Sequence, residues 1–414
     1  METGSNEGSS LRNLLNDLDE CPQLSDTYDA ALIRAEQRLR SWEALFQRER
    51  AEAVGLIREL LSHPPERHEL ILRNNPRYFT WGSLERLLEQ SWAHRLESPD
   101  RAEHLARLAL LVAERLDPAL YGAASIEDLQ ARAWGYIGNA HRVSADLNEA
   151  TRAFACAFRH LRQGTREPIE HAILLDLAAS LRRAQRRFRD ALRLLQRSFS
   201  LFEEVGDCHR AGRTLLSIEI VLSVAGQSEK GIPLLYKAIE LIDATREPLL
   251  LLCAWHNLID SLADAGRHLE ARRLLNRVRP LYAPFQGSSI ELRSEWLAGK
   301  IALGLRQDEE AETLLAKVRR GFLAEDAPYA AAVISLELSA LYAMQGRTQE
   351  MKEIAAETMS FFSVRQIHRE AAAALAHWKH AVDTETAGLD LVMRLVAFLK
   401  RARYDRDLTF EPPA

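Results

Sequence analysis

The stretch from Thr245 to Tyr282 reads TREPLLLLCAWHNLIDSLADAGRHLEARRLLNRVRPLY and contains the features that decide the fold. Near its start lies Pro248, which suits the first turn of a helix because that turn needs no backbone N–H donor. Apolar residues then recur with a helical period, and Gly266 marks a turn before a second amphipathic segment that starts at Ala271. The stretch therefore predicts a helical hairpin.

The same pattern recurs along the chain with a period of about 40 residues, which is in the range of helical-hairpin repeats. TREP occurs at Thr165–Pro168 and again at Thr245–Pro248, and Pro328 follows after the same interval once more. The TREP copies are thus 80 residues apart, which is two repeats. Within each repeat a small residue opens the second helix, and these residues are Ala150, Ala191, Gly231, Ala271 and Ala311, with Met351 in phase. One hairpin cannot bury both of its apolar faces alone, so such copies are expected to stack.

Individual copies match a known repeat position by position. A less regular hairpin, Phe79–Trp92 followed by Asp100–Leu116, counts as the first copy, and the second copy has Trp134, Gly138, Ala150, Phe154 and Ala157. These residues resemble the tetratricopeptide repeat (TPR), which has an aromatic residue early in its first helix, a small residue mid-helix and Ala at the start of its second. The fifth copy is less complete, since it keeps Trp255, Leu258, Ala271 and Leu275 but has Ile259 and Val278 at the small positions.

The resemblance covers residues 79–362, with a period of 40 in place of about 34. That period is nearer to long-repeat relatives such as kinesin light chain and the bacterial peptide-sensing and sugar-sensing regulators. The resemblance implies an all-α fold, a right-handed α-solenoid of about seven TPR-like hairpins with helical caps. It also implies a scaffold that binds peptides.

Four segments are expected along the chain. Residues 1–27 form an acidic, flexible arm, and the stretch 1–29 carries a net charge of −6. Residues 28–78 form an N-terminal helical segment with one long helix, Tyr28 to Leu61, that ends at Pro64–Pro65. Residues 79–362 form the solenoid. Residues 363–414 hold two capping helices and a tail, and these helices are expected at His368–Val382 and Leu389–Tyr404.

Composition favours helices and gives no sign of export. The chain has 414 residues, only 19 Gly and 14 Pro, and a net charge of −5, although 47 of its 54 basic residues are Arg. The four cysteines show no CxxC or metal-type spacing, and the polar N-terminus excludes a secretory signal peptide. The longest apolar run, Leu249–Trp255, is far shorter than a membrane span. We therefore expect a cytoplasmic protein without a membrane segment.

Motifs for enzymatic chemistry are missing from the sequence. It has no GxxxxGK[ST], GxGxxG or GxSxG, and neither His68-Glu69 nor His368-Arg369-Glu370 has a second His at metal-ligand spacing. The most enzyme-like string is His256 to Asp260. These two residues are four apart on one helix, so pairing with each other, contact with a ligand and catalysis are the alternatives, and catalysis is the least favoured. We predict no enzyme activity, no cofactor and no metal.

The candidate binding residues come from the register of the repeat. In TPR proteins the concave side is lined by side chains of the first helix of each repeat. In this sequence those positions lie about 18, 15, 11, 8 and 7 residues before the small residue that opens the second helix. The residues taken from this register are Arg132, Asn139, Arg142, Asp176, Ser180, Arg183, Arg213, His256, Asp260, Arg293, Trp296 and Lys300. Positive charge exceeds negative charge among them, which suits a peptide carboxylate or acidic side chains. Alternatively, they are the ordinary polar edges of amphipathic helices.

A second basic feature is a run of arginines with a net charge of +6. It consists of Arg182, Arg183, Arg186, Arg187, Arg189, Arg193 and Arg197, with Asp190 as its one acid. A solvated turn, a site for an acidic protein segment and a site for nucleic-acid phosphate all remain open. Nucleic acid is disfavoured because interleaved aromatic residues for base stacking are missing. The acidic arm is a candidate to dock on this run.

Two functions follow from the sequence. The first is a non-enzymatic scaffold or adaptor that binds a protein or peptide segment in the concave groove, with acidic segments among the candidates. The alternative is a bacterial regulator whose solenoid senses a peptide or small ligand and controls a partner regulator or effector.

Overall fold

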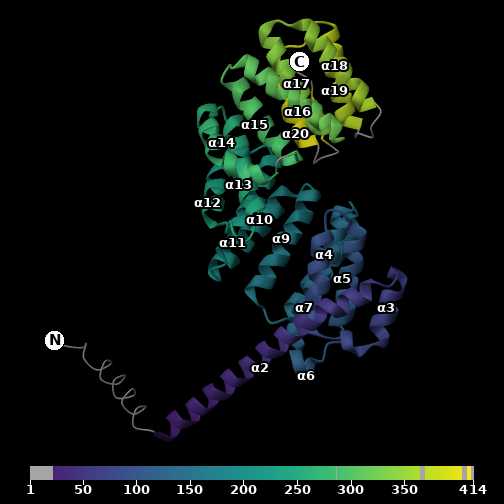
Figure 1. The fold of residues 1–414 in the computed structure, drawn as a ribbon, viewed down its shortest axis with the longest axis vertical. Helices are drawn as coiled ribbons and strands as arrows, with labels where there is room; N and C mark the ends of the chain where they lie inside the picture. Colours follow the sequence, from purple (N-terminus) through teal and green to yellow (C-terminus); the bar gives the residue numbers. More distant parts are fainter. Residues whose placement is uncertain (1–21, 286, 364–368, 403–407, 412–414) are drawn as a thin grey trace, which may run out of the picture. The chain divides into compact units, whose positions relative to one another are not determined.

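The computed structural model describes residues 22–285, 287–363, 369–402 and 408–411, and every regular element in these ranges is a helix (Figure 1). The all-α prediction is confirmed. The chain divides into two compact units between Thr165 and Arg166, inside the segment 79–362. The four segment boundaries expected from the sequence remain predictions, and most of the acidic arm lies outside the described residues.

Unit 1 contains one long helix followed by shorter ones. Its elements are α2 (Pro22–Leu61), α3 (Pro65–Asn74), η1 (Pro76–Tyr78), α4 (Trp81–His94), α5 (Pro99–Ala113), α6 (Pro118–Tyr121), α7 (Ala123–Val143) and α8 (Leu147–Gln163). The second half of α2 packs on α4 through buried residues such as Ile57 and Leu60, whereas its first half extends away from the other helices of the unit (Figure 1). Helices α4/α5 and α7/α8 are the two hairpins of this unit.

The TPR signature has a direct packing reason in the second hairpin. A Cβ atom placed on Gly138 of α7 would lie 2.9 Å from Cδ2 of Phe154 on α8. Ala150 and Ala157 of α8 are fully buried. The small residues therefore let the two helices approach, and the large apolar residue fills the space between them.

Unit 2 continues the pattern with five further hairpins. They are α9 (Pro168–Ala184) with α10 (Phe188–Glu204), α11 (Cys208–Val224) with α12 (Ile232–Leu241), α13 (Pro248–Asp264) with α14 (His268–Tyr282), α15 (Ser289–Gly304) with α16 (Asp308–Ala324), and α17 (Pro328–Gln345) with α18 (Thr348–Ser363). Helices α9, α13 and α17 begin at Pro168, Pro248 and Pro328, as the sequence predicted. Each helix packs on the next along the chain, and Leu215, Leu235, Leu258 and Leu275 belong to one buried cluster across α11 to α14.

The predicted start of the second helices is three residues late. Helices α10, α14 and α16 begin at Phe188, His268 and Asp308, so the buried alanine is the fourth helical residue of each. The first turn of these helices is half-buried or exposed and lies before the apolar period begins, so the apolar periodicity does not include it.

The turn inside six of the seven hairpins contains a residue in the left-handed conformation. These turn residues recur at the repeat interval and are Ala145, Arg186, Gly226, Gly266, Arg306 and Gly346, with φ between 60° and 76°. Gly adopts this conformation without a steric penalty, whereas a residue with a Cβ is strained there. Three hairpins of the chain therefore carry strain at this turn that the Gly-containing hairpins lack.

We expect Arg306→Gly to raise the free energy of unfolding by about 0.5–1 kcal/mol, because it removes that strain at the cost of some unfolded-state entropy. Gly266→Ala makes the opposite change at the same turn position of another hairpin. The added Cβ would have no atom within 4 Å, so the effect comes from the backbone φ of +75° alone. It should destabilise the chain by about 1 kcal/mol. Urea unfolding measures both. Changes of the same sign in the two variants would contradict a role for the backbone conformation.

The last two helices behave differently from each other. Helix α19 (Arg369–Asp383) packs on α18 as one more stacked helix, whereas α20 (Leu389–Ala402) packs along α17 and also contacts α19. The buried side of α20 joins the core formed with α17 through Leu391, Leu395 and Leu399. Helix α20 therefore does not extend the row of hairpins (Figure 1).

Candidate functional site

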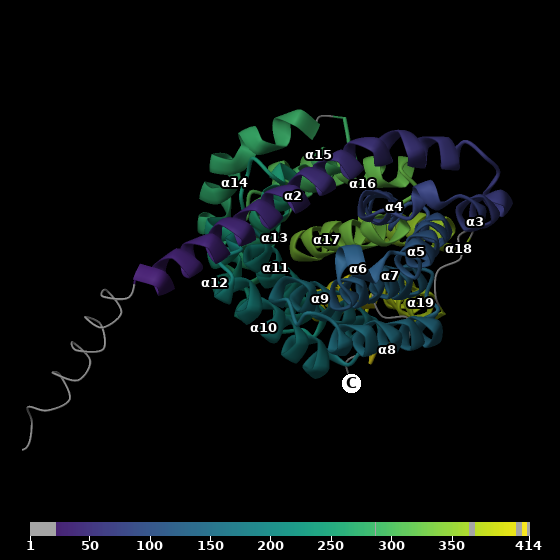
Figure 2. The ribbon, with the colours of Figure 1, turned by 90° about the horizontal axis from the view of Figure 1, so that it is seen from below.

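The first helices of the hairpins in unit 2 form one surface, which we call the inner face and define by α9, α11, α13, α15 and α17. Figure 2 shows α12 and α14 on the outside of the curve that these helices follow, with α11 and α13 on the inside. This order agrees with the register argument, in which first-helix residues line the concave side. The outer helices supply the apolar residues that hold neighbouring hairpins together.

The sequence-derived binding residues are distributed over both units. Arg132, Asn139 and Arg142 lie on α7 in unit 1. The other nine lie in unit 2, namely Asp176, Ser180 and Arg183 on α9, Arg213 on α11, His256 and Asp260 on α13, and Arg293, Trp296 and Lys300 on α15. Their assignment to a binding site remains a prediction, and each unit is described by itself.

In unit 1 the candidate residues are engaged with neighbouring groups. Asn139 is buried, and its Oδ1 accepts hydrogen bonds from Nε and Nη2 of Arg142 at 3.0 and 2.9 Å. Arg132 interacts electrostatically with Glu85, which also accepts a hydrogen bond of 2.7 Å from Nε of Arg50. The Asn139 side chain is therefore used within α7.

In unit 2 the structure brings several predicted residues into one group of charges. The ammonium of Lys300 on α15 pairs with Asp260 and lies 2.6 Å from Oδ1 of Asp264, both on α13. The same Asp264 oxygen is 3.1 Å from Nζ of Lys400 on α20. Close by, Nε1 of Trp296 donates to Oε2 of Glu337 on α17 at 2.6 Å. We call Asp260, Asp264, Lys300 and Lys400 the inner-face cluster.

Asp260 and Lys300, the central pair of the inner-face cluster, are ionised at neutral pH. Burial raises the pKa of the Asp260 carboxyl, but the ammonium groups of Lys300 and Lys400 outweigh burial and hold that pKa well below its usual range. Burial lowers the pKa of Lys300, but Asp260 and Asp264 outweigh it and hold that pKa above its usual range. Two carboxylates and two amines thus face one another in this cluster, and of the four residues only Asp260 and Lys300 are among the predicted groove residues.

His256 lies beside this cluster and is held in its neutral form. Burial lowers the pKa of His256 to about 4, and Arg293 and Lys300 add to that effect while Asp260 opposes it. Its Nδ1 lies 3.1 Å from the hydroxyl of Tyr282 on α14. Asp260 makes its hydrogen bond with Lys300. Each of the two residues in the enzyme-like string therefore has its own partner on another helix.

Four residues of this region were not among the predicted ones. Asp264 lies seven residues before the small residue Ala271, which is one of the register positions expected to line the concave side. The repeat register could therefore have predicted it. Glu219 and Glu337 are buried carboxylates within apolar runs of α11 and α17, where a search for apolar periodicity passes over them. Lys400 lies outside the repeats, and no sequence pattern connects it to α13.

Glu219 is one of the missed residues whose pKa departs strongly from the ordinary glutamate value. Its Oε2 accepts a hydrogen bond from Nδ2 of Asn257 on α13 at 2.9 Å. Burial raises its pKa to about 7, against the lowering effect of the Asn257 bond. A group whose folded pKa is raised in this way takes up protons on folding, so ionising it costs stability as the pH rises from about 4.5 to 7.

We expect Glu219→Gln to stabilise the chain by about 2 kcal/mol at pH 8, because the uncharged amide removes the cost of ionising a buried carboxyl. The gain should vanish at pH 5, where Glu219 is already protonated in the folded chain. Urea unfolding at both pH values measures it. Glu229→Gln on the exposed η2 turn (Ser228–Gly231) is the matched control and should change little at either pH. A gain at pH 8 that persists at pH 5 would contradict this account.

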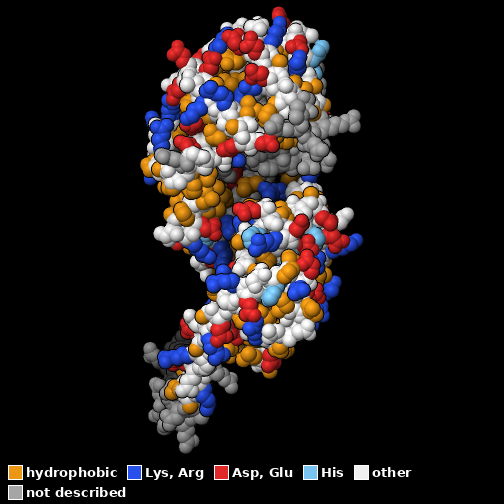
Figure 3. All heavy atoms as spheres, turned by 45° about the vertical axis from the view of Figure 1, so that its right-hand side comes forward, with side chains coloured by type: hydrophobic (Ala, Val, Ile, Leu, Met, Phe, Trp, Pro, Cys, Tyr) orange, Lys and Arg blue, Asp and Glu red, His pale blue; other side chains and the backbone are white. Residues whose placement is uncertain are grey.

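The remaining charged candidates occupy the surface around these helices. Arg213 of α11 lies 3.7 Å from Glu247, and within the basic run Arg187 and Arg193 both pair with Asp190. On the face shown in Figure 3, basic and acidic side chains of the described residues are intermixed. Such a surface lacks the continuous basic stripe that tracks a phosphate backbone.

The chemical groups next to His256 do not form a nucleophilic pair. Cys253 lies three residues earlier on α13 with an exposed side chain, and partial desolvation by its neighbours raises the pKa of its thiol above the ordinary value. Burial likewise raises the pKa of the Tyr282 hydroxyl.

In the described part of the chain, no three His, Cys, Asp or Glu side chains gather as metal ligands would. None of the described helices has the length and apolarity to span a bilayer.

Comparisons with known proteins bear on the fold. The chain resembles the crystal structure of a Rap protein complexed with competence and sporulation factor, at 13% identity and a TM-score of 0.54, over 78% of this chain and 87% of that chain. It also resembles aspartyl phosphate phosphatase F from Bacillus subtilis, at 14% identity and a TM-score of 0.52, over 88% of this chain and 96% of that one. No family model and no curated protein matches the sequence.

A third similar structure is a kinesin light chain with TPR-like repeats from Podosopora anserina, at 16% identity and a TM-score of 0.38, over 50% of this chain and 98% of that chain. The two structures with scores above 0.5 establish the fold by themselves. The chain is a TPR-like helical-repeat protein in fold, as its residues predicted.

Proposed function

We propose that this protein binds a peptide or an extended segment of another protein on the inner face of unit 2, and that it acts without catalysing a reaction. The observation that carries the proposal is the gathering of His256 and Asp260 of α13 with Lys300 of α15, while Trp296 lies one helical turn before Lys300. A surface with charged groups and an aromatic side chain at a regular spacing suits a segment that runs across several hairpins.

Charge at the edge of this face suggests where acidic groups of the partner bind. Arg293 is exposed on α15 and interacts electrostatically with both Cys253 and His256. Arg183 and Arg213 lie on α9 and α11 of the same face. Guanidinium groups bind carboxylates with paired hydrogen bonds, so an acidic side chain or a terminal carboxylate of the partner would be placed here.

The second candidate function is a regulator in a bacterial cytoplasm. It is favoured by one specific observation, the likeness in fold to a Rap protein that was crystallised with competence and sporulation factor. In this function, peptide binding to the inner face changes how the chain contacts a partner regulator. The other similar structure is named a phosphatase, and an enzyme of that kind is the alternative that a phosphatase assay on acyl phosphate substrates would reveal.

A binding experiment tests the proposal directly. Peptides selected from a random dodecamer display library on the full chain should bind with measurable affinity, and Arg293→Glu should weaken that binding about 10-fold or more. Arg273→Glu is the matched control, because Arg273 is also exposed but lies on the outer helix α14. Fluorescence anisotropy with the labelled peptide measures the dissociation constants. Equal losses in both variants, or no selected peptide, would contradict binding on the inner face.

A further inference from the structure

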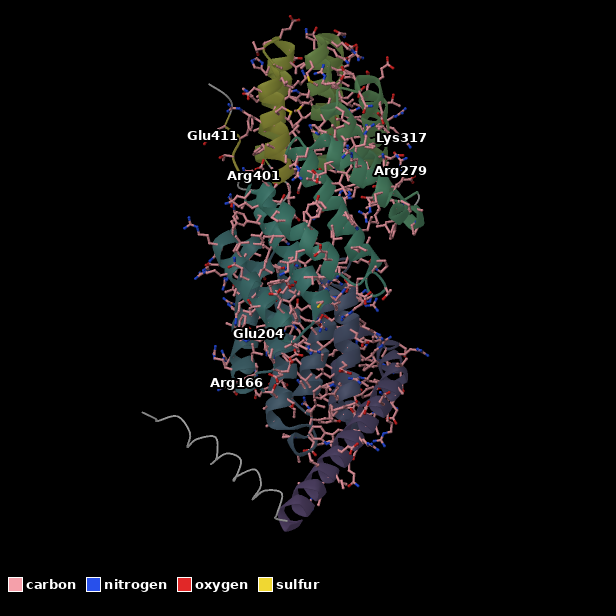
Figure 4. All side chains as sticks on the ribbon, turned by 90° about the vertical axis from the view of Figure 1, so that its left-hand side faces the viewer. Arg166, Glu204, Arg279, Lys317, Arg401 and Glu411 are labelled. Carbon is pink, nitrogen blue, oxygen red and sulfur yellow. The ribbon has the colours of Figure 1, made fainter. Side chains whose placement is uncertain are left out.

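Helix α20 lies on the inner face of unit 2 instead of at the end of the row of hairpins. It packs along α17 and against α19, and its Lys400 reaches Asp264 on α13 across 136 residues of sequence. Figure 4 shows Arg401 at the end of α20 beside the earlier helices of the unit. The guanidinium of Arg401 is 4.0 Å from the position that a Cβ on Gly226 would take. Helix α20 thus covers part of the inner face.

The contacts of α20 are those of an amphipathic helix in a groove. Its inward side is apolar and almost fully buried, and consists of Leu391, Val392, Leu395, Val396, Phe398 and Leu399. Its outward side carries Met393, which is 54% exposed, and Arg394, which pairs with Asp390 on the same helix. Apolar anchors at helical spacing with a charged residue at one end are the features by which grooves recognise helices.

The charge at the end of α20 is matched by the face beneath it. Asp260 and Asp264 together carry two negative charges, and Lys300 supplies one ammonium between them. Lys400 supplies the second ammonium and is 26% exposed at its side chain. Without α20, the face therefore keeps an uncompensated negative charge next to an exposed apolar surface, and that combination would attract another helix that ends in a cation.

We propose that α20 is an internal occupant of a helix-binding site, and that the same site accepts from a partner protein an amphipathic helix whose apolar stripe ends in Lys or Arg. The inference rests on the proposed function, because it names one class of segment that the inner face binds. A covalently attached helix has a high effective concentration, so the partner helix competes with α20 for the site. Loosening α20 consequently strengthens binding of the partner.

The probe for the experiment is a synthetic, fluorescein-labelled peptide with the sequence of residues 389–402, LDLVMRLVAFLKRA. Its binding to the full chain is measured by fluorescence anisotropy. In the Lys400→Glu chain, α20 loses its ion pair and places a like charge beside Asp264. We expect that chain to bind the peptide about 10-fold or more tightly than the unchanged chain does, which corresponds to about 1.4 kcal/mol.

The matched control is Arg394→Glu, a charge reversal on the outward side of the same helix, which should leave the dissociation constant within about twofold. A peptide with glutamate in place of its own lysine should bind the Lys400→Glu chain about 10-fold more weakly. Hydrogen exchange follows the displacement, since the backbone amides of α20 should exchange faster when the peptide is bound. If circular dichroism shows that Lys400→Glu is unfolded, Lys400→Gln takes its place.

Two results would overturn the inference. One is that the peptide binds neither the Lys400→Glu nor the Lys400→Gln chain. The other is that α20 exchanges as slowly as α17 in every variant, with or without peptide. Display-selected peptides that remain sensitive to Arg293→Glu would then still support the proposed function. Conversely, binding of the α20 peptide without any selected peptide would support the helix site and count against the wider groove.

Discussion

Lys300→Met is expected to lower the free energy of unfolding by about 3 kcal/mol, because it leaves Asp260 and Asp264 without their shared ammonium. Breaking a buried ion pair by removing one partner costs about 3–5 kcal/mol, and the lower end applies here since both carboxylates are about two-fifths exposed. Chemical denaturation of the full chain at pH 7 measures the change.

The control for this variant is Lys317→Met. Lys317 also pairs with a carboxylate, Glu295, but its own side chain is 58% exposed, against 11% for Lys300. An exposed pair contributes about 0–1 kcal/mol, so this second substitution should have a small effect. Equal effects of the two substitutions would contradict a special role for the inner-face cluster.

The cost of Lys300→Met should also depend on pH in a defined direction. The folded pKa of Asp260 is depressed, so its pairing contributes stability that is present above the ordinary aspartate pKa of about 3.9. That contribution is lost as the pH falls below this value towards the depressed folded pKa. The difference between the unchanged chain and the variant should therefore shrink in acid.

Gly82→Ala is expected to destabilise unit 1 by about 3 kcal/mol or more, through a clash of the kind that overpacking causes. Gly82 is where α4 crosses α2, and an added Cβ would lie 2.4 Å from the backbone carbonyl carbon and oxygen of Glu49. Backbone atoms inside a helix cannot move aside without shifting the whole helix. The two helices would have to separate, which opens the core that contains Ile57 and Leu84.

Gly55→Ala is the matched variant for this prediction. Gly55 lies on α2 as well, is exposed, and has no atom within 4 Å of its added Cβ. Alanine in an exposed helix interior is more favourable than glycine by about 0.5–1 kcal/mol, so this substitution should stabilise the chain. Urea denaturation monitored by circular dichroism distinguishes the two. A mild effect of Gly82→Ala would show that the crossing tolerates a wider spacing.

Much of the fold could be predicted because it depends on local patterns. The prolines at Pro168, Pro248 and Pro328 mark helix starts, since a helix tolerates proline only in its first turn. The small residues at the repeat interval mark close helix contacts, as Gly138 and Phe154 show. Both signals lie within one or two turns of the structure that they specify.

The candidate site was less predictable because its partners are distant in sequence. His256, Asp260 and Lys300 follow from the register of the repeat. The contact of Lys400 with Asp264 depends on α20 folding back over the inner face, and no periodic pattern encodes that placement. Glu219 and Glu337 were missed for a different reason, because a buried carboxyl within an apolar run looks like an interruption of the pattern.

Binding of a segment to the inner face is the central claim, and hydrogen exchange on the full chain tests it most directly. With a display-selected peptide at saturation, the backbone amides of α11, α13 and α15 should exchange more slowly than in the free chain. The amides of the outer helices α12 and α14 should keep their rates. Slower exchange confined to the outer helices, or unchanged rates throughout the inner ones, would contradict the claim.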